Sequence, residues 1–230
     1  NNGLQTNKTT SLFLDKKYVW VGTEGGGLCL LNKKTALITH YKNEPNAPLS
    51  ISDNNILTIT KGFNDKVLIG TNNGLNIATI NDNGLSFTTV KNHNGNQHSR
   101  FNVVSAIFTA SENELWFGSQ GNGLFRINVE NGDTIINHYE NNDYDRTSIP
   151  SNIVHSIISG RTGSIWIGTQ DGISHFDPIK LGFQHYTYKY GDENSLNEKN
   201  VWSIYEGDDE IMWVGTRKGV SRINLKKNQY

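Results

Sequence analysis

The sequence is poor in cysteine and proline, and these shortages exclude some classes of protein. Its 230 residues include one cysteine, Cys29, so an internal disulfide and a cysteine-rich zinc site are both excluded. We interpret Cys29 as a small buried hydrophobic residue on a strand. There are 4 prolines against 23 glycines, a balance that suits short strands joined by tight turns. A chain of this length buries enough apolar surface to fold without a disulfide or a structural metal.

An excess of one charge and a long apolar run are also missing. Lysine and arginine number 21 and aspartate and glutamate 22, which gives a net charge of −1. A surface for nucleic acid would show a basic excess, so nucleic acid is not an expected partner. The same balance disfavours binding to an anionic membrane surface. The sequence has no run of about 18 apolar residues, so we expect no direct membrane insertion by this segment.

What the sequence does contain is a fivefold repeat. Its centre is a four-residue motif, Trp-x-Gly-Thr or a close variant, and the glycines of successive copies are 48, 48, 50 and 47 residues apart. The copies are residues 20–23, 68–71, 116–119, 166–169 and 213–216. All but one of the five tryptophans lie in this motif. Self-similarity at a fixed period of this length is typical of repeat architectures.

Each repeat holds four short β-like segments separated by turn residues, and no segment carries a helical apolar stripe. The fourth segment is clear at residues 38–41, 135–139 and 183–186 and weaker at 86–90. Four antiparallel strands in a unit of roughly 40–50 residues form one blade of a β-propeller. We therefore predict an all-β fold, a β-propeller of tandem four-stranded antiparallel blades with five repeats of about 48 residues.

The predicted propeller domain covers residues 1–230, with blades at about 4–46, 47–95, 96–145, 146–192 and 193–230. The last blade is expected to lack its outer strand, which would begin near Tyr230. No signal peptide opens the chain and Asn1 is not a natural start, so we expect an excised or processed piece. Five blades can close with one three-stranded member, or the chain is an arc of a larger ring, which we favour. An open arc would expose apolar blade faces and invite self-association through faces or edges.

Within a blade, each residue of the motif has an expected structural role. The tryptophan is interpreted as a wedge between neighbouring blades, because of its large apolar area. The motif tryptophans are therefore expected to share one environment. The glycine is interpreted as permitting a close backbone approach or an unusual dihedral angle.

Further parts of the repeat are most distinct at residues 152–157, 163–169 and 171–177 and in the inter-blade linker 190–196, with looser linkers at 43–52 and 141–151. On these residues the repeat resembles the two-component regulator propeller repeat. Blade two departs most, since Leu68 replaces the tryptophan. The resemblance implies the periplasmic sensor region of a bacterial inner-membrane receptor, with a histidine kinase or a diguanylate cyclase as its output. It also implies signal transduction through ligand binding, in many such proteins of oligosaccharides derived from polysaccharides.

The sequence shows no catalytic motif, since a nucleophile elbow, a phosphate-binding glycine loop and His-Glu-x-x-His are all missing. We therefore expect no catalytic residues, no cofactor and no metal. His93 and His98 are too few for a metal site, and Asp143 and Asp145 lack the later glycine and glutamate of a calcium loop. Three histidines recur at the same place on the fourth strand and are interpreted as structural: His40, His138 and His185.

A ligand is expected on the face formed by the turns between second and third strands, and at the mouth of the central channel. There the loop residues vary on a constant framework, which is how scaffolds acquire specificity. The residue at the start of the first strand varies likewise: Thr10, Leu57, Ser105, His155 and Trp202. Trp202 can stack on a sugar ring, or it packs between blades. The candidate ligand-binding residues are Glu24, Asn72, Gln120, His155, Asp171, Trp202 and Arg217.

Three functions stay open at this point. The first, which we favour, is a ligand-sensing or interaction propeller of a receptor, with an oligosaccharide or another small molecule as its ligand. The second is a propeller enzyme, a lyase or a glycosidase; a glycosidase would need two carboxylates about 5–10 Å apart in a pocket. The third is a purely structural scaffold that dimerises a receptor.

Overall fold

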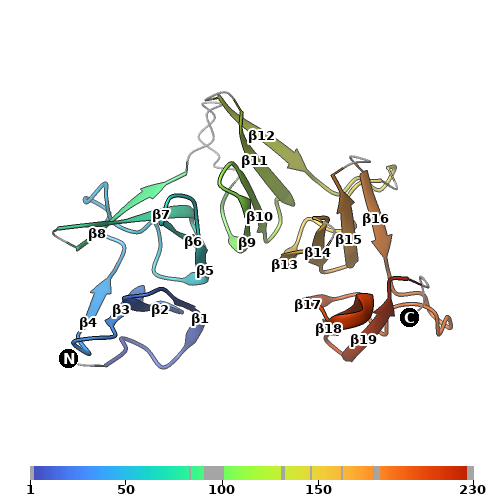
Figure 1. Cartoon of the computed structure of the whole chain (residues 1–230), viewed down its shortest axis with the longest axis horizontal. Helices are drawn as coiled ribbons and strands as arrows, with labels where there is room; N and C mark the ends of the chain where they lie inside the picture. The colour runs from blue at the N-terminus through green and yellow to red at the C-terminus, as the bar shows by residue number, and fades with distance from the viewer. Residues whose placement is uncertain are drawn as a thin grey trace. The chain divides into compact units, whose positions relative to one another are not determined.

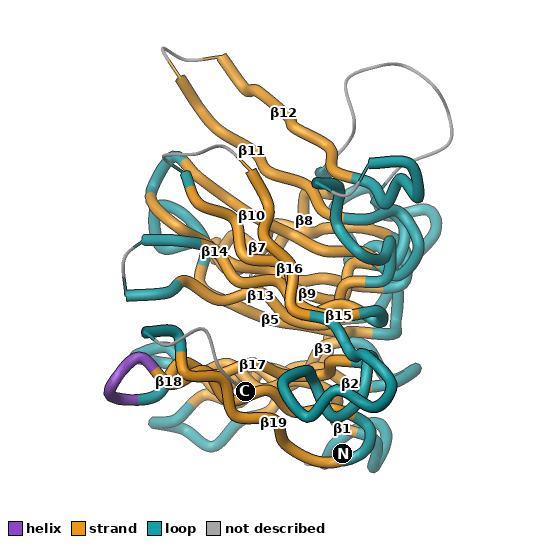
Figure 2. Tube along the Cα trace, turned by 90° about the vertical axis from the view of Figure 1, so that its right-hand side faces the viewer, coloured by secondary structure: helices purple, strands orange, loops and turns teal. Residues whose placement is uncertain are grey.

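The protein is built from β-strands, as the sequence predicts. The computed structural model describes residues 3–82, 84–90, 101–130, 133–145, 147–161, 163–178 and 182–226. Strands dominate these ranges, and the exception is a short 3-10 turn at Asp208–Glu210, drawn in purple in Figure 2. Among the described residues, no helix is long and apolar enough to cross a membrane. The prediction of an all-β fold is confirmed.

The chain separates into two compact units, Asn1–Asn113 and Glu114–Tyr230. The first unit contains two sheets and the strand β9 (Figure 1). Its first sheet is β1 (Thr9–Leu14), β2 (Tyr18–Thr23), β3 (Leu28–Asn32) and β4 (Ile38–Tyr41). Its second sheet is β5 (Ile56–Lys61), β6 (Val67–Thr71), β7 (Gly74–Asn81) and β8 (Gly84–Thr89). The strand β9 covers Val104–Ser111.

The second unit continues the series with three further groups of strands. The first group is β10 (Glu114–Ser119), β11 (Leu124–Glu130) and β12 (Asp133–Tyr139). The second is β13 (Val154–Ser159), β14 (Ile165–Thr169), β15 (Gly172–Asp177) and β16 (Gly182–Tyr186). The third is β17 (Val201–Glu206), β18 (Ile211–Thr216) and β19 (Gly219–Asn224).

Five antiparallel sheets result, and we call them blades one to five, with strands A to D of each blade in chain order. The predicted fourth segments are confirmed: residues 38–41 are β4, and the others fall in β8, β12 and β16. Blade five has three described strands, A to C. The predicted outer strand near Tyr230 lies outside the described residues.

The core forms where one blade packs on the next. Trp20 of β2 is completely buried in a cluster with Ile56 of β5 and Phe87 of β8. Trp166 of β14 is buried in the same way, in a cluster with Val201 of β17. In both cases the covering side chains come from the following blade, so the interpretation of the tryptophan as a wedge between blades is correct for these positions.

Trp213 does not share this environment, and for this residue the prediction is wrong. Its side chain is 43% exposed, whereas Trp20 is 0% exposed. The side chains that cover Trp20 include Ile56 and Phe87 of the next blade, and no described strand follows β19 in the chain. Val220 of β19 is exposed as well. Self-association through such a face stays a prediction.

The motif glycine is required by a bulge at the start of strand A. The pairing of β13 with β14 shifts register between Val154 and Ser156, which leaves His155 as the extra residue of a bulge. A Cβ atom at Gly168 would overlap the Ser156 hydroxyl and would lie 2.9 Å from Val201 Cγ1 of the next blade. Two strands of one blade and the first residue of the next therefore meet at this glycine, as a close approach requires.

The last residue of the motif closes the turn between strands B and C. In every blade its hydroxyl donates a hydrogen bond to the carbonyl oxygen of a glycine three or four residues later. The pairs are Thr23–Gly27, Thr71–Gly74, Ser119–Gly123, Thr169–Gly172 and Thr216–Gly219. The B–C turns thus have a fixed frame, and their remaining side chains are free to differ.

The linker between blades three and four is also held in shape by its own hydrogen bonds. Asn141 Nδ2 donates to Ile149 O at 3.0 Å, and Asn142 N donates to Ser148 Oγ at 2.9 Å. Asp145 accepts from the backbone N–H and the hydroxyl of Thr147. The carboxylate of Asp145 therefore stabilises a turn of this linker.

Candidate functional site

The variable position at the start of strand A is the bulge residue. Register shifts identify it in four blades as Thr10, Leu57, His155 and Trp202. A bulge leaves one residue unpaired and re-aims its side chain, so the constant framework presents a different side chain in each blade. This geometry could not be read from the sequence, although the variability of the position could.

His155 and Trp202, from neighbouring blades of the second unit, lie against each other. Their ring centroids are 4.5 Å apart and the rings are inclined by 30°. Trp202 is 54% exposed, so it packs against His155 of the preceding blade and also presents surface to solvent. Burial lowers the pKa of His155 below its ordinary value, which favours the neutral imidazole. Its Nε2 atom is buried and has no hydrogen-bond partner among the described residues.

An ion pair joins the same two blades at the same end of their strands. Lys199 Nζ lies 3.0 Å from Asp171 Oδ1. Asp171 belongs to the B–C turn of blade four, and Lys199 lies three residues before Trp202. The hydrogen bond and charge of Asp171 raise the pKa of Lys199 above its ordinary value. Sequence reasoning missed Lys199, because nothing in its spacing indicated a partner in the preceding blade.

Backbone contacts place Gln120 and Arg217 near the starts of β13 and β17. Gln120 forms an isolated β-bridge with Ile153, two residues before His155. The N–H of Arg217 donates to the carbonyl oxygen of Asn200, two residues before Trp202, at 3.3 Å. Five of the seven predicted residues are thus brought to the starts of β13 and β17.

Glu24 and Asn72 occupy equivalent B–C turns, but in the first unit. The N–H of Glu24 donates to Lys8 O at 3.0 Å, and that of Asn72 donates to Asn55 O at 3.2 Å. The carboxylate of Glu24 pairs with the Lys8 ammonium at 3.2 Å, and both side chains are exposed. The printed contacts of Glu24 and Asn72 therefore lie within their own blades of the first unit.

The histidines of strand D make local contacts within their own blades. His40 Nδ1 lies 3.1 Å from the sulfur of Cys29, the residue opposite it on strand C. His138 Nε2 donates to Asn122 O at 2.7 Å, and its ring stacks on Phe125. These contacts fit a structural role. Cys29 is buried, as predicted, and burial raises the pKa of its thiol.

The other two histidines considered as metal ligands, His93 and His98, lie outside the described residues. In the described part of the chain, no group of three His, Cys, Asp or Glu side chains is placed to hold a metal ion.

The partly buried ring of His155 leads to a prediction about pH. Because the folded-state pKa is below the ordinary value of 6.5, the unfolded chain binds more protons around that pH. This difference lowers the stability of the fold as the pH drops through 6.5, until the folded pKa is passed. In thermal unfolding followed by circular dichroism, we expect His155→Gln to lose less Tm on acidification than the parent chain.

An NMR titration of the His155 ring provides the direct check. We expect a midpoint below 6.5, and a midpoint above that value would contradict the lowering of the His155 pKa by partial burial.

The strand order and the blade-on-blade core define a class of protein, the β-propellers, and solved structures share this fold. The extracellular domain of the hybrid two component system BT3049 from B. thetaiotaomicron matches with a TM-score of 0.77 and 21% identity. The match covers 99% of this chain and 28% of that domain. Virginiamycin B lyase from Staphylococcus aureus matches with a TM-score of 0.61 and 16% identity, over 95% of this chain and 67% of the lyase. The predicted propeller fold is confirmed, and it occurs in the extracellular domain of a two component system and in a lyase.

Two of the repeats match a known family of repeats. Residues 148–171 and 195–218 match the two component regulator propeller, in each case from the end of a linker through strands A and B. The chain therefore carries two component regulator propeller repeats, as its sequence predicts. Histidine kinase P4 of Formosa agariphila is 27% identical over 177 residues, or 74% of this chain. The chain spans 12% of the length of that kinase.

Proposed function

We propose that the chain is a ligand-binding part of the periplasmic sensory region of a bacterial receptor. The regulator propeller repeats support this proposal, as does the similarity to a histidine kinase and to an extracellular receptor domain. A histidine kinase is the output module that these relatives favour. The membrane anchor and the output module of such a receptor would belong to a longer protein.

The observation that carries the proposal is the half-exposed aromatic pair of His155 and Trp202. An open indole face offers an apolar platform to the C–H face of a sugar ring, and polar groups beside it can select hydroxyl groups. The buried Nε2 of His155 lacks a partner in the described structure, and the Asp171–Lys199 ion pair lies at the same end of the strands. We therefore propose an oligosaccharide as the ligand.

Binding is favoured over catalysis by the partners of the nearby carboxylates. Asp171 is paired with Lys199, and Glu198 accepts a hydrogen bond from the N–H of Asn200 at 3.1 Å. A glycosidase needs one carboxyl group kept protonated and a second one ionised across a bound sugar. Carboxylates that serve to tie blades and turns together do not supply that arrangement. The lyase of similar fold is the reason to test for turnover as well.

The site is tested by calorimetry with oligosaccharides prepared from alginate, laminarin, xylan and pectin. We expect one class to bind with a Kd in the micromolar range, and Trp202→Ala to weaken binding tenfold or more, which corresponds to about 1.4 kcal/mol. Because Trp202 is 54% exposed, its loss should leave the unfolding temperature almost unchanged.

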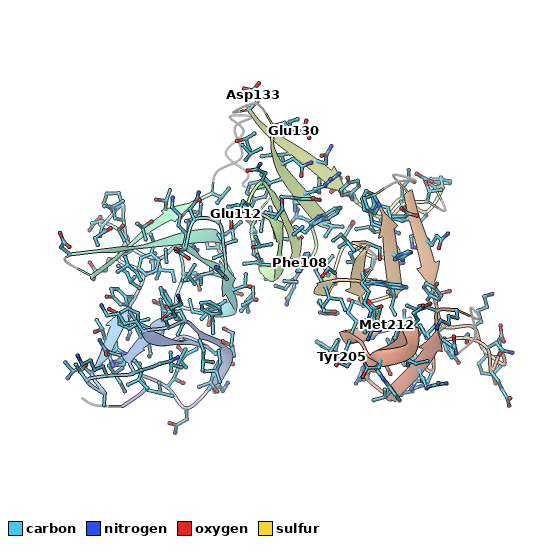
Figure 3. The ribbon with its side chains drawn as sticks, in the orientation of Figure 1. Phe108, Glu112, Glu130, Asp133, Tyr205 and Met212 are labelled. Carbon is cyan, nitrogen blue, oxygen red and sulfur yellow. The ribbon has the colours of Figure 1, made fainter. Side chains whose placement is uncertain are left out.

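Tyr205→Ala is the matched control, since Tyr205 lies on the same strand, is 68% exposed and is labelled in Figure 3. It should bind the sugar as the parent chain does. Failure of every oligosaccharide to bind, or cleavage of the bound sugar, would count against a sensory role.

A further inference from the structure

We propose that a groove in the first unit, lined by apolar side chains and rimmed by lysines, binds a short acidic peptide with apolar side chains. The groove lies between blades one and two and has a volume of about 600 Å³. Its lining includes the end of β1, the turn at Asp15–Lys17 and the turn before β6. It is thus at the A–B turns, at the opposite end of the strands from the B–C turns. We call it the lysine groove, and it is a site additional to that of the proposed function.

The floor of the lysine groove is apolar. Phe13 of β1 and Val67 of β6 line it, and both also contact the core between the two blades. Ile80, near the end of β7, lines the opening and is 50% exposed. An exposed aliphatic side chain at the mouth of a cavity favours a ligand that has apolar groups of its own.

Two other pairs of neighbouring blades close this gap with hydrogen bonds. Between blades two and three, Asn64 N donates to Glu112 Oε2 at 3.1 Å, and Glu112 is labelled in Figure 3. Between blades four and five, Arg161 N donates to Glu206 Oε2 at 2.9 Å, and Arg161 Nη2 donates to Gly207 O at 2.6 Å. The A–B turns of these blades are therefore tied together.

No such bond joins the described A–B turns of blades one and two. The Asp15 carboxylate is turned into its own blade, where it accepts from Tyr18 N and from Trp20 Nε1, both at 2.6 Å. Lys61 of blade two occupies the position that Glu206 occupies in blade five. Lys61 has the same charge as Lys16 and Lys17 of blade one, which line the same groove. The missing tie leaves the space that forms the lysine groove.

The rim of the lysine groove is basic. Of the described residues that line it, four are lysines: Lys16, Lys17, Lys61 and Lys66. The two carboxylates of the lining do not balance them. Asp15 is held by the hydrogen bonds of its own turn, and the exposed Asp65 lies 4.0 Å from Lys61. Because the whole chain has a net charge of −1, this is a local concentration of positive charge, and its complement is an anionic ligand.

The aromatic geometry favours a peptide over an acidic sugar. The Lys17 ammonium lies 4.9 Å from the centroid of the Tyr18 ring, so this face is covered. The same ring packs edge-on against Trp20, at 6.5 Å and 83°. A sugar would need an open aromatic face, whereas aliphatic side chains can use the floor formed by Phe13 and Val67.

The shape of the hollow also suits an extended chain. A second hollow of about 440 Å³ shares Lys17, Tyr18 and Ile80 with the lysine groove and continues along Asn81 and Leu85. An extended peptide points successive side chains to opposite sides, so alternating acidic and apolar residues would meet the rim and the floor in turn.

The probe is a fluorescein-labelled peptide of about seven residues that alternates glutamate and leucine, measured by fluorescence anisotropy with the 230-residue chain. We expect a micromolar Kd that weakens as salt is raised. A peptide with lysine in place of glutamate should not bind. The double variant Lys16→Glu and Lys66→Glu should weaken binding tenfold or more.

The matched control is the double variant Lys8→Glu and Lys42→Glu, which makes the same change of charge at the other end of the strands of blade one. It should bind the glutamate–leucine peptide like the parent chain, and so should Trp202→Ala, which tests the proposed sugar site separately. The proposal is overturned if the peptide does not bind saturably, if both double variants bind equally well, or if a galacturonate hexamer displaces it at lower concentration.

Discussion

Replacing Trp20 with alanine should lower the free energy of unfolding by about 3–5 kcal/mol, because the side chain is large and completely buried between two blades. The substitution removes contacts to Ile56 and Phe87 of the next blade. It also removes the hydrogen bond from Trp20 Nε1 to Asp15 Oδ2 at 2.6 Å, which leaves that carboxylate without one of its donors. Urea unfolding followed by circular dichroism measures the loss as a lower midpoint.

Trp213→Ala is the natural control, since the same motif position is 43% exposed in blade five. A tryptophan that is open to solvent has less apolar area to lose, so we expect a decrease of about 1 kcal/mol. If the two substitutions cost the same, the packing of one blade on the next would not be the source of stability.

The strands and their order are predictable from the sequence because they depend on local properties. The alternation of apolar residues and the glycines and asparagines of the turns repeat in phase five times. Residues 38–41, chosen on this basis, coincide with β4. The environment of each motif tryptophan could not be predicted from the local sequence, because it depends on the neighbouring blade. Trp166 and Trp213 have the same local sequence pattern and different exposures for this reason.

The candidate site is predictable only in part. The repeat places the B–C turns and the starts of strand A in equivalent positions, so Gln120 and Asp171 could be assigned to the same end of a blade as His155. The bulge could not be foreseen, because register is a property of two paired strands rather than of one segment. The Lys199–Asp171 ion pair could not be predicted for a similar reason, since it joins a linker to a turn of the preceding blade.

The glycine of the motif provides the second test of large effect. In Gly118→Ala, the new Cβ atom would overlap Val154 Cγ1 and would lie 2.5 Å from Val154 Cβ. Val154 is fully buried at the start of β13, and its Cβ cannot move away unless its backbone moves too. Overpacking of a core usually costs about 1–3 kcal/mol, and we expect this substitution to cost about 3 kcal/mol in urea unfolding.

Replacing the motif glycine of blade five, Gly215, tests whether crowding by a fixed Cβ atom costs more stability than crowding by a side-chain end that can rotate. In Gly215→Ala the new methyl group would overlap the Ser203 hydroxyl, and the next nearest atom is 3.6 Å away. A hydroxyl at the end of a side chain can rotate, so we expect a cost of about 1 kcal/mol and recovery in the double variant with Ser203→Ala. Val154→Ala should not rescue Gly118→Ala, because the crowded Cβ atom is still present. If Val154→Ala did restore the stability of Gly118→Ala, the close approach of the β10 and β13 backbones would not be the reason that residue 118 must be glycine.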